Sequence, residues 1–320
     1  MLGYIVFPQW LTPNIAPGIP IRWYGIMYLL AFATTYVLFR REAARSELHA
    51  TQESIDGFFF WSIIGVLVGG RLSYVLFFDT TTDYLSQPWL VISPVRDGQF
   101  TGIQGMNFHG GFVGAAIAVV LYTRAKKLNL LDWGDTLAVC VPLGYTFGRI
   151  GNFINEELQG RVTAVPWGVV FPRARYFPRS FAWVQSIEQQ SRLDVDPMAQ
   201  MVSLPRHASQ LYEAFLEGIV LWLILWFVFR IERPFRGASI ALYTVGYGCA
   251  RFIAEFFKET SDASLLAAEG NAPDGLLVPT TPVIDSAQWL SLALVLIGLG
   301  LFIAFRVAHR APATVETYTE

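Results

Sequence analysis

Seven stretches of about 20 mostly apolar residues limit what this chain can fold into, because each could cross the hydrocarbon core of a bilayer as a helix. They cover residues 20–39, 57–78, 107–123, 135–153, 211–229, 238–257 and 288–305. Hydrophobic residues make up 53% of the chain and charged residues only 15%, which is more apolar than a typical soluble domain. The sequence predicts an all-α polytopic membrane protein with seven transmembrane helices.

Basic residues gather after every second apolar stretch, and this sets the predicted orientation. They are Arg40, Arg41, Arg45, Arg124, Lys126, Lys127, Arg230, Arg233, Arg236, Arg306 and Arg310. The other short loops hold little beyond Arg96 and Lys258. Because short cytoplasmic loops are enriched in lysine and arginine, we expect the N-terminus outside and the C-terminus in the cytoplasm.

Two polar segments divide the chain into three predicted parts. Residues 1–153 hold the first four transmembrane helices, with the N-terminal segment and an external segment at 79–106. Residues 154–210 form a long external head segment in which aromatic residues are interleaved with arginines. Residues 211–320 hold the last three helices and a short cytoplasmic tail. A small folded cap and an ordinary external loop both fit the head segment, since loops of this length carry function or disorder.

Charge and cysteine content argue against several other kinds of protein. The net charge of -2 gives no reason to expect nucleic-acid binding. Both cysteines, Cys140 and Cys249, lie in apolar stretches, so neither a disulfide framework nor a metal site is indicated. Met1 to Trp10 lack a basic region and a small-residue cleavage site, so no cleavable signal peptide is expected.

Polar residues inside the apolar stretches share one depth in the predicted topology. The outer ends or outer thirds of the stretches hold Tyr24, Arg71, His109, Arg149, Asn152, Glu213, Arg251 and Glu255. A charged residue inside a membrane costs roughly 2.5–3.5 kcal/mol on insertion scales, so it is a functional candidate by default. A conduction path would need polar lining through the whole thickness. The pattern therefore favours a site at the outer membrane face.

Spacing along the predicted helices places polar residues and glycines on shared faces. Arg149, Asn152 and Glu156 are spaced i, i+3 and i+7, so one helix face presents all three if the helix continues that far. Small-xxx-small pairs, which let helices approach closely, occur at Gly65/Gly69, Gly110/Gly114 and Gly144/Gly148.

The intramembrane charges allow a structural interpretation beside a functional one. Tyr247, Arg251 and Glu255 form a second stripe at i, i+4 and i+8. Arg71 and Arg251 could extend to the interface, or pair with Glu213 or Glu255 as structural ion pairs do.

Several arginines and asparagines at one depth fit phosphate recognition better, because the guanidinium fork binds phosphate with two hydrogen bonds. The most abundant phosphate at that depth is a phospholipid headgroup. His109 alone is typical of a satisfied histidine at a helix end. Beside a cationic pocket of phosphate size, it is equally compatible with a general base.

The chain resembles the prolipoprotein diacylglyceryl transferase family over nearly its whole length. The matching motifs are Trp23–Gly25, Gly69–Leu72, Phe108–Gly111, residues 148–161, Arg206–Glu213, Gly246–Gly248, Arg251–Phe252 and Glu255–Phe257. Residues 148–161 are the most specific of these. The chain departs from the family pattern at Glu156, where glycine is usual, at Gln159, where an aromatic is usual, and at Ala208, where proline is usual.

The resemblance implies transfer of diacylglyceryl from phosphatidylglycerol to the lipobox cysteine thiol of a preprolipoprotein in the bacterial inner membrane. A thioether forms and glycerol phosphate leaves, as the first step of lipoprotein maturation. Phosphatidylglycerol, lipobox signal peptides and membrane lipids are the implied partners. Neither a metal nor an organic cofactor is required, and segment 154–210 resembles the family's periplasmic head.

The resemblance also implies roles for the residues already singled out. His109 would take the thiol proton, while Arg149 and Arg251 would bind the phosphodiester and stabilise charge on the departing phosphate. Tyr24 and Tyr247 would lie beside the reacting carbon. The remaining predicted substrate-binding residues are Arg71, Asn152, Asn155, Glu157, Gly160 and Glu255.

Two other classes of function also fit an arginine-lined headgroup site. A lipid transporter or flippase would need one, but polarity confined to the outer half argues against transport. A non-catalytic lipid-binding protein is the second alternative. Formation of a thioether by the purified protein separates all three.

Overall fold

The computed structural model describes residues 3–16, 21–46, 48, 50–79, 84, 86–93, 95–96, 99–100, 105–231, 233–259 and 284–310. The chain forms two compact units. The first unit comprises Met1–Phe39 with Asp135–Glu320, and the second unit comprises Arg40–Gly134. The predicted tail after Arg310 and the start of the first apolar stretch, at residue 20, lie outside the described residues.

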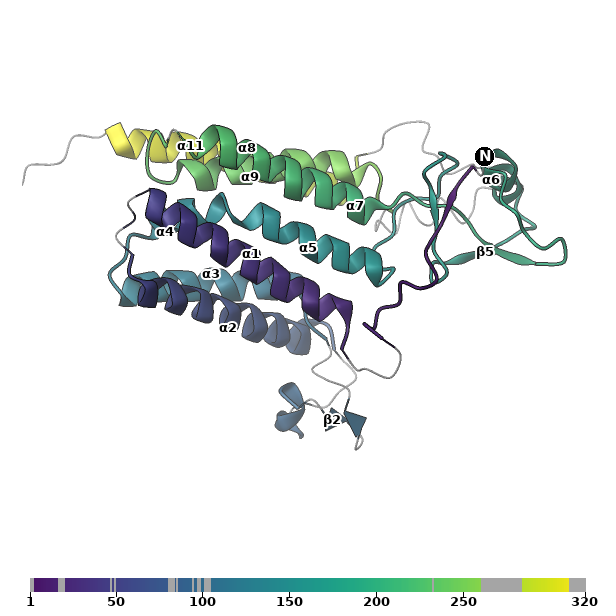
Figure 1. Cartoon of the computed structure of the whole chain (residues 1–320), viewed down its shortest axis with the longest axis horizontal. Coiled ribbons are helices and arrows are strands. Elements are labelled where there is room, and N and C mark those ends of the chain that lie inside the picture. The colour runs from purple at the N-terminus through teal and green to yellow at the C-terminus, as the bar shows by residue number, and fades with distance from the viewer. Residues whose placement is uncertain are drawn as a thin grey trace, which may run out of the picture. The chain divides into compact units, whose positions relative to one another are not determined.

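Helices make up most of the described chain (Figure 1). They are α1 (Trp23–Arg45), α2 (Gln52–Phe77), α3 (Phe108–Ala125), α4 (Leu130–Ala138), α5 (Val141–Ile154), α6 (Ala182–Ser191), α7 (Ser209–Glu213), α8 (Leu221–Ile224), α9 (Ala238–Glu255) and α11 (Ser286–Arg310). A 3-10 turn covers Pro88–Val91. The strands are short: β1 (Ile5–Val6), β2 (Val95–Arg96), β3 (Gln99–Phe100), β4 (Val169–Val170), β5 (Tyr176–Pro178) and β6 (Met201–Ser203).

Four helical stretches are long and apolar enough to cross a membrane, and the bent pair α4 and α5 is a fifth candidate. The four are α2, α3, Ser209–Phe229 and α11. These helices agree with a polytopic helical membrane protein. The two other predicted stretches form α1 and α9, which do not meet the same test of length and composition within the described residues.

Helices α2 and α3 pack along each other in the second unit. A Cβ on Gly69 would clash with the carbonyl oxygen of Gly110, and a Cβ on Gly65 with that of Gly114. In a membrane, helix association depends on such close packing, because lipid tails are as apolar as the side chains. The prediction that these two glycine pairs serve helix packing is confirmed.

The stretch predicted at 135–153 is broken rather than continuous. Its two parts, α4 and α5, meet at an angle of 50°. Pro142 stands in the first turn of α5, where its missing N–H costs least but where a preceding helix cannot continue. A side chain on Gly144 would clash with α1, whereas Gly148 has open space beside it. Only the first glycine of this pair therefore serves close packing.

One continuous helical stretch, Ser209–Phe229, joins α7 and α8. It contains two π-helical segments, Ala214–Val220 and Leu225–Phe229. Such segments are rare and often occur at functional sites. In the first unit α9 packs on this helix and, more extensively, on α11, as Figure 1 shows.

The predicted head segment 154–210 is folded, which favours the small cap over an ordinary loop. Strand β4 pairs in parallel with β1, and β5 pairs in antiparallel with β6. A buried cluster joins α6 to β6 and the residue after it, through Val184, Ile187, Val202 and Leu204. The aromatic residues seen in the sequence support this packing: Phe177 contacts Trp183 with ring centroids 5.0 Å apart.

Candidate active site

The carboxylate of Glu213 is the centre of a buried ionic cluster in the first unit. Glu213 ends α7 and its side chain is 0% exposed. Arg149 of α5 approaches one carboxylate oxygen through Nη1 at 3.3 Å. Arg251 of α9 donates from Nη1 to the other oxygen at 2.9 Å. One carboxylate therefore fixes two guanidinium groups that come from different helices.

Tyr145 and Glu217 form a second layer behind Arg149. The Nε of Arg149 donates to the hydroxyl of Tyr145, and that hydroxyl donates to Glu217 at 2.6 Å. Glu217 also lies 3.8 Å from Nη1 of Arg251. The two glutamates on the Ser209–Phe229 helix, four residues apart, thus hold both arginines.

Lys258 and Glu255 complete the cluster at the end of α9. The Nζ of Lys258 lies 3.4 Å from a carboxylate oxygen of Glu213 and 3.4 Å from one of Glu255. Glu255 also lies 3.4 Å from Nη2 of Arg251. Three cations face three carboxylates, so the cluster is balanced in formal charge.

The cationic side chains of this cluster are more exposed than its carboxylates. The three cationic side chains keep between 14% and 21% of their surface exposed, while the three carboxylates keep between 0% and 5%. Anything that reaches the cluster from its accessible side therefore meets guanidinium and ammonium groups first. Such an arrangement favours an anionic ligand.

The turn after α5 holds the predicted amide residues against Glu157. Asn152 and Asn155 each point Nδ2 toward a carboxylate oxygen of Glu157, at 3.5 and 3.4 Å. The backbone N–H of Glu157 donates to the carbonyl of Asn152 at 2.9 Å. These three predicted residues therefore form one hydrogen-bonded group.

Glu156 does not extend the α5 face, because the helix ends at Ile154 and Glu156 has a left-handed φ of 56°. Its buried carboxylate accepts the backbone N–H of Arg173 at 3.0 Å and lies 3.7 Å from Nε of that residue. The condition for a shared Arg149–Asn152–Glu156 face is not met. This glutamate instead anchors the folded head segment.

Gly160 lies where two other chain segments leave no room for a side chain. A Cβ there would clash with the carbonyl oxygens of Phe257 and His207. The turn that precedes it is fixed to the start of α7, since Gln210 donates to the carbonyl of Glu157 at 2.6 Å. In this structure Gly160 is needed for close packing of the chain, and its role in substrate binding stays a prediction.

Tyr24 of α1 and Tyr247 of α9 both lie next to α5. Tyr24 packs near Gly151, and its hydroxyl is 3.2 Å from that of Tyr28. The ring of Tyr247 contacts that of Tyr145 edge-on, with centroids 6.2 Å apart. Tyr247 therefore adjoins the layer that holds Arg149.

His207 lies just before the Ser209–Phe229 helix and beside the Gly160 turn. Burial and the positive charge of Arg161 lower the pKa of its imidazole below the usual histidine value. Its Nδ1 is 3.2 Å from the hydroxyl of Tyr212. The ring is therefore a neutral hydrogen-bonding group near pH 7.

In the second unit, Arg71 uses its guanidinium to hold backbone. It is 5% exposed. Its Nε and Nη2 donate to the carbonyls of Val91 and Leu90 at 2.6 and 2.9 Å, and its Nη1 donates to that of Gly105 at 3.0 Å. These contacts tie α2 to parts of the predicted external segment 79–106.

His109 is the second residue of α3 and is exposed. Asn107 caps this helix by accepting the N–H of Gly110 at 3.1 Å. The imidazole ring contacts that of Phe108, with centroids 5.8 Å apart. The cap fixes the backbone of the first turn, from which His109 projects.

The sequence interpretation missed Tyr145, Glu217 and Lys258. Glu217 was detectable, since it is an ionisable residue four positions after Glu213 in an apolar stretch. Tyr145 precedes Arg149 by four residues, which places both on one helix face. Within the described residues, no group of three or more histidine, cysteine, aspartate or glutamate side chains could hold a metal ion.

Comparison with known proteins shows which chains this one is similar to. The family model described as prolipoprotein diacylglyceryl transferase matches residues 12–304. The phosphatidylglycerol–prolipoprotein diacylglyceryl transferase of Treponema pallidum is 41% identical, over 96% of this chain and 96% of its own length. Enzymes of the same name from Treponema denticola and Paraburkholderia xenovorans are 45% and 40% identical, over 81% and 95% of this chain and 81% and 97% of their own lengths.

Proposed function

The chain belongs to the prolipoprotein diacylglyceryl transferase family, and on that premise we propose the reaction that it catalyses. It transfers the diacylglyceryl group of phosphatidylglycerol to the lipobox cysteine thiol of a preprolipoprotein. A bond forms between the cysteine sulfur and the glycerol carbon. The bond from that carbon to the phosphate oxygen breaks, and glycerol phosphate leaves with the electron pair. The thiol proton passes to a base, because the thiolate is the nucleophile.

The observation that supports this function best is the cationic side of the Glu213 cluster. Arg149 and Arg251 are the ligands proposed for the phosphodiester, because a planar guanidinium matches two phosphate oxygens. Arg149 donates from Nε to Tyr145 and approaches Glu213 through Nη1, and its side chain keeps 14% of its surface exposed, so part of the guanidinium is accessible to a phosphate. Charge that develops on the departing phosphate would be stabilised by donors already in place.

Glu213, Glu217 and Tyr145 would prepare the two arginines for this task. A shared carboxylate sets the spacing between the guanidinium groups before the lipid arrives, which lowers the cost of ordering them. Tyr145 orients Arg149 through Nε and is itself oriented by Glu217. We assign these three residues a positioning role.

The turn from Asn152 to Gly160 would receive the headgroup glycerol. Asn152, Asn155 and Glu157 supply amide and carboxylate groups that suit hydroxyl groups. Gly160 keeps the turn compact. Tyr24 and Tyr247 are proposed as hydrogen-bonding neighbours of the reacting carbon.

His109 remains the proposed proton acceptor, on the strength of its motif and its exposed position at the start of α3. Glu255 would act within the cluster, through Arg251 and Lys258. For Arg71 the three carbonyl contacts support an indirect role, in which it shapes the segment after α2.

The proposed topology has seven crossings of a bacterial inner membrane, with the N-terminus and the folded 154–210 segment in the periplasm. A cysteine at Ala125, the last residue of α3 and among basic residues, should resist an impermeant thiol reagent added to intact spheroplasts. A cysteine at Met198, which is 87% exposed in the head segment, should react. The opposite labelling pattern would reverse the orientation and remove the site from the outer face.

The purified protein alone tests the function. It would be incubated with phosphatidylglycerol and a lipobox peptide, and the product examined by mass spectrometry for a diacylglyceryl thioether. A peptide with serine in place of the lipobox cysteine should give no product. Lipid movement between leaflets without thioether would indicate a transporter, and lipid binding alone would indicate a non-catalytic protein.

A further inference from the structure

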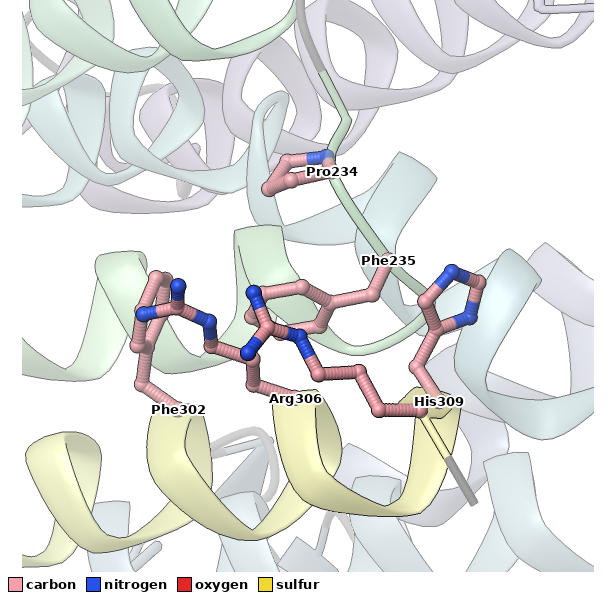
Figure 2. A pocket seen from close by; sticks show the side chains of 6 residues that line it. Pro234, Phe235, Phe302, Arg306 and His309 are labelled. Carbon is pink, nitrogen blue, oxygen red and sulfur yellow. The ribbon is translucent and has the colours of Figure 1, made fainter. Parts of the chain in front are cut away.

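A second basic site lies near the start of α9 and the end of α11, whereas the Glu213 cluster includes Arg251 and Glu255 at the other end of α9. It is a pocket in the first unit between the turn before α9 and the last turns of α11. Its lining is Pro234, Phe235, Phe302, Arg306, His309 and Arg310. Figure 2 shows Phe302, Arg306 and His309 rising from α11 toward Phe235.

The lining of this pocket contains cationic groups and no carboxylate. Arg306 and Arg310 are four residues apart, so their side chains lie on one face of α11. Both are exposed, and neither forms an ion pair with any residue that the structure describes. The Glu213 cluster balances every cation with a carboxylate, whereas Arg306 and Arg310 have no carboxylate counterion among the described residues. An anion would relieve their repulsion.

The walls of the pocket are fixed by packing. The buried ring of Phe235 lies against that of Phe302, with centroids 4.9 Å apart. Gly237 has a left-handed φ of 87°, and a Cβ there would clash with the ring of Phe305. The carboxylate of Asp135 accepts the N–H of Gly237 at 2.7 Å, which holds the turn on α4. A ligand would therefore meet a preformed surface.

The position of the pocket indicates the source of the anion. The pocket adjoins the end of α11, a candidate membrane span, and follows closely on Phe229, the end of another. Leu299 and Ile303 are exposed, and they continue the stripe of Arg306 and Arg310 along α11. An apolar stripe leading to guanidinium groups suits a lipid, whose acyl chain covers the stripe and whose phosphate reaches the arginines.

We infer that the pocket between Pro234–Phe235 and the end of α11 binds the phosphate group of an anionic phospholipid. By the basic-residue pattern this lipid belongs to the cytoplasmic leaflet, so the site is separate from the proposed substrate site at the outer face. Its function would be to anchor the α9–α11 pair at that surface. The inference does not depend on the transfer reaction.

Native mass spectrometry of the full chain tests this inference, with dioleoyl phosphatidic acid as the probe and dioleoyl phosphatidylcholine as the neutral reference. The double variant Arg306→Gln/Arg310→Gln should bind phosphatidic acid on the order of tenfold more weakly than the wild type. A control, Arg124→Gln/Lys127→Gln, removes two exposed basic residues at the end of α3 and should change binding less than about twofold. Thioether formation should be unchanged in both variants, which separates this site from the proposed function.

Two outcomes would overturn the inference. Equal phosphatidic acid binding by the wild type and Arg306→Gln/Arg310→Gln would show that the pocket holds no lipid phosphate. Equal weakening in the control would show that surface charge alone attracts the lipid.

A third arm uses inorganic phosphate with the protein in phosphatidylcholine nanodiscs. Phosphorus NMR broadening that requires Arg306 and Arg310, together with phosphatidic acid binding that does not require them, would assign the pocket to free phosphate compounds and reject the lipid. Circular dichroism confirms that each variant is folded.

Discussion

Arginines inside the apolar helices of the two units are used in different ways. In the second unit, Arg71 is 5% exposed and donates hydrogen bonds from Nε, Nη1 and Nη2 to three backbone carbonyl oxygens. In the first unit, Arg149 and Arg251 are 14% and 21% exposed and share the carboxylate of Glu213. One arginine holds backbone segments together, and the other two form a partly accessible cationic surface.

The contrast shows that the partners of a buried arginine indicate its use better than its depth does. Arg71 donates to backbone carbonyl oxygens, so its guanidinium stabilises the fold. The carboxylates that face Arg149 and Arg251 neutralise their charge but leave part of each guanidinium side chain exposed. Burial of such charges is tolerated only when they are paired, and breaking a pair by removing one partner costs roughly 3–5 kcal/mol. Variants of Arg149 and Arg251 therefore need a folding measurement beside the activity measurement.

The largest expected effect concerns His109, which shares the second unit with Arg71. If the second unit only supports the fold, His109→Gln should leave turnover unchanged. We expect instead a loss of roughly 10²–10⁴-fold at pH 7, because proton transfer in the transition state is lost. Raising the pH should restore part of the rate, since a thiol with a pKa of about 8.5 ionises unaided. Initial rates from pH 7 to 9 test this. An absence of pH rescue would move the base assignment to Glu157.

Arg251→Ala should lower turnover by roughly 10²–10³-fold, which is the cost of removing one donor that stabilises developing negative charge. Arg251 makes contacts with three glutamates, so the variant also needs a thermal unfolding measurement. Arg251→Lys keeps the charge but loses the planar fork, so comparing it with Arg251→Ala separates the effect of charge from that of guanidinium geometry. Wild-type activity of Arg251→Ala at normal protein levels would return Arg251 to a purely structural ion pair.

Tyr145→Phe should lower turnover by about tenfold, because one hydrogen bond to the charged Arg149 is lost, worth roughly 1.5–3 kcal/mol. Glu217→Gln should have an effect of similar direction. If Tyr145 acts through the Tyr145–Glu217 contact, the double variant should lose much less than the product of the two single effects. Independent, multiplying losses would contradict this positioning role.

The smallest expected effect is a pH dependence of stability from His207, which lies beside the cation Arg161. Its lowered pKa means that the unfolded chain binds a proton more readily than the folded protein does. Stability should therefore fall as the pH drops through the unfolded value of about 6.5, and level off below the folded pKa. The unfolding midpoint should drop by on the order of 1 °C more in the wild type than in His207→Asn between pH 7.5 and 5.5. Identical pH profiles would mean that this imidazole keeps an ordinary pKa.

Much of the helical architecture follows from apolar length alone. The stretches predicted at 57–78, 107–123 and 211–229 correspond to α2, α3 and the Ser209–Phe229 helix within a few residues. The break between α4 and α5 was missed because Pro142 lies in an otherwise apolar run. Length and hydropathy detect a membrane helix, but they are insensitive to a bend inside it.

The candidate site could be predicted only in part. Depth in the predicted topology identified Arg149 and Arg251, and the structural interpretation offered Glu213 as a partner of Arg71 or Arg251. It could not show that one glutamate serves both arginines, because that depends on how three helices pack. Glu156 shows the opposite failure, since a local left-handed turn removed it from the face that spacing had assigned.

The most direct test compares Arg149→Lys with Arg71→Lys, using turnover and thermal unfolding in the same preparations. Both variants keep the charge but lose the planar fork. Arg149→Lys should lose roughly 10²–10³-fold in turnover with little change in the unfolding midpoint, because its fork serves the phosphodiester. Arg71→Lys should unfold at a lower temperature while each folded molecule keeps nearly full turnover, because its fork holds backbone carbonyls. Full turnover in Arg149→Lys, or destabilisation of the same size in both variants, would contradict a phosphate-binding role for the Glu213 cluster.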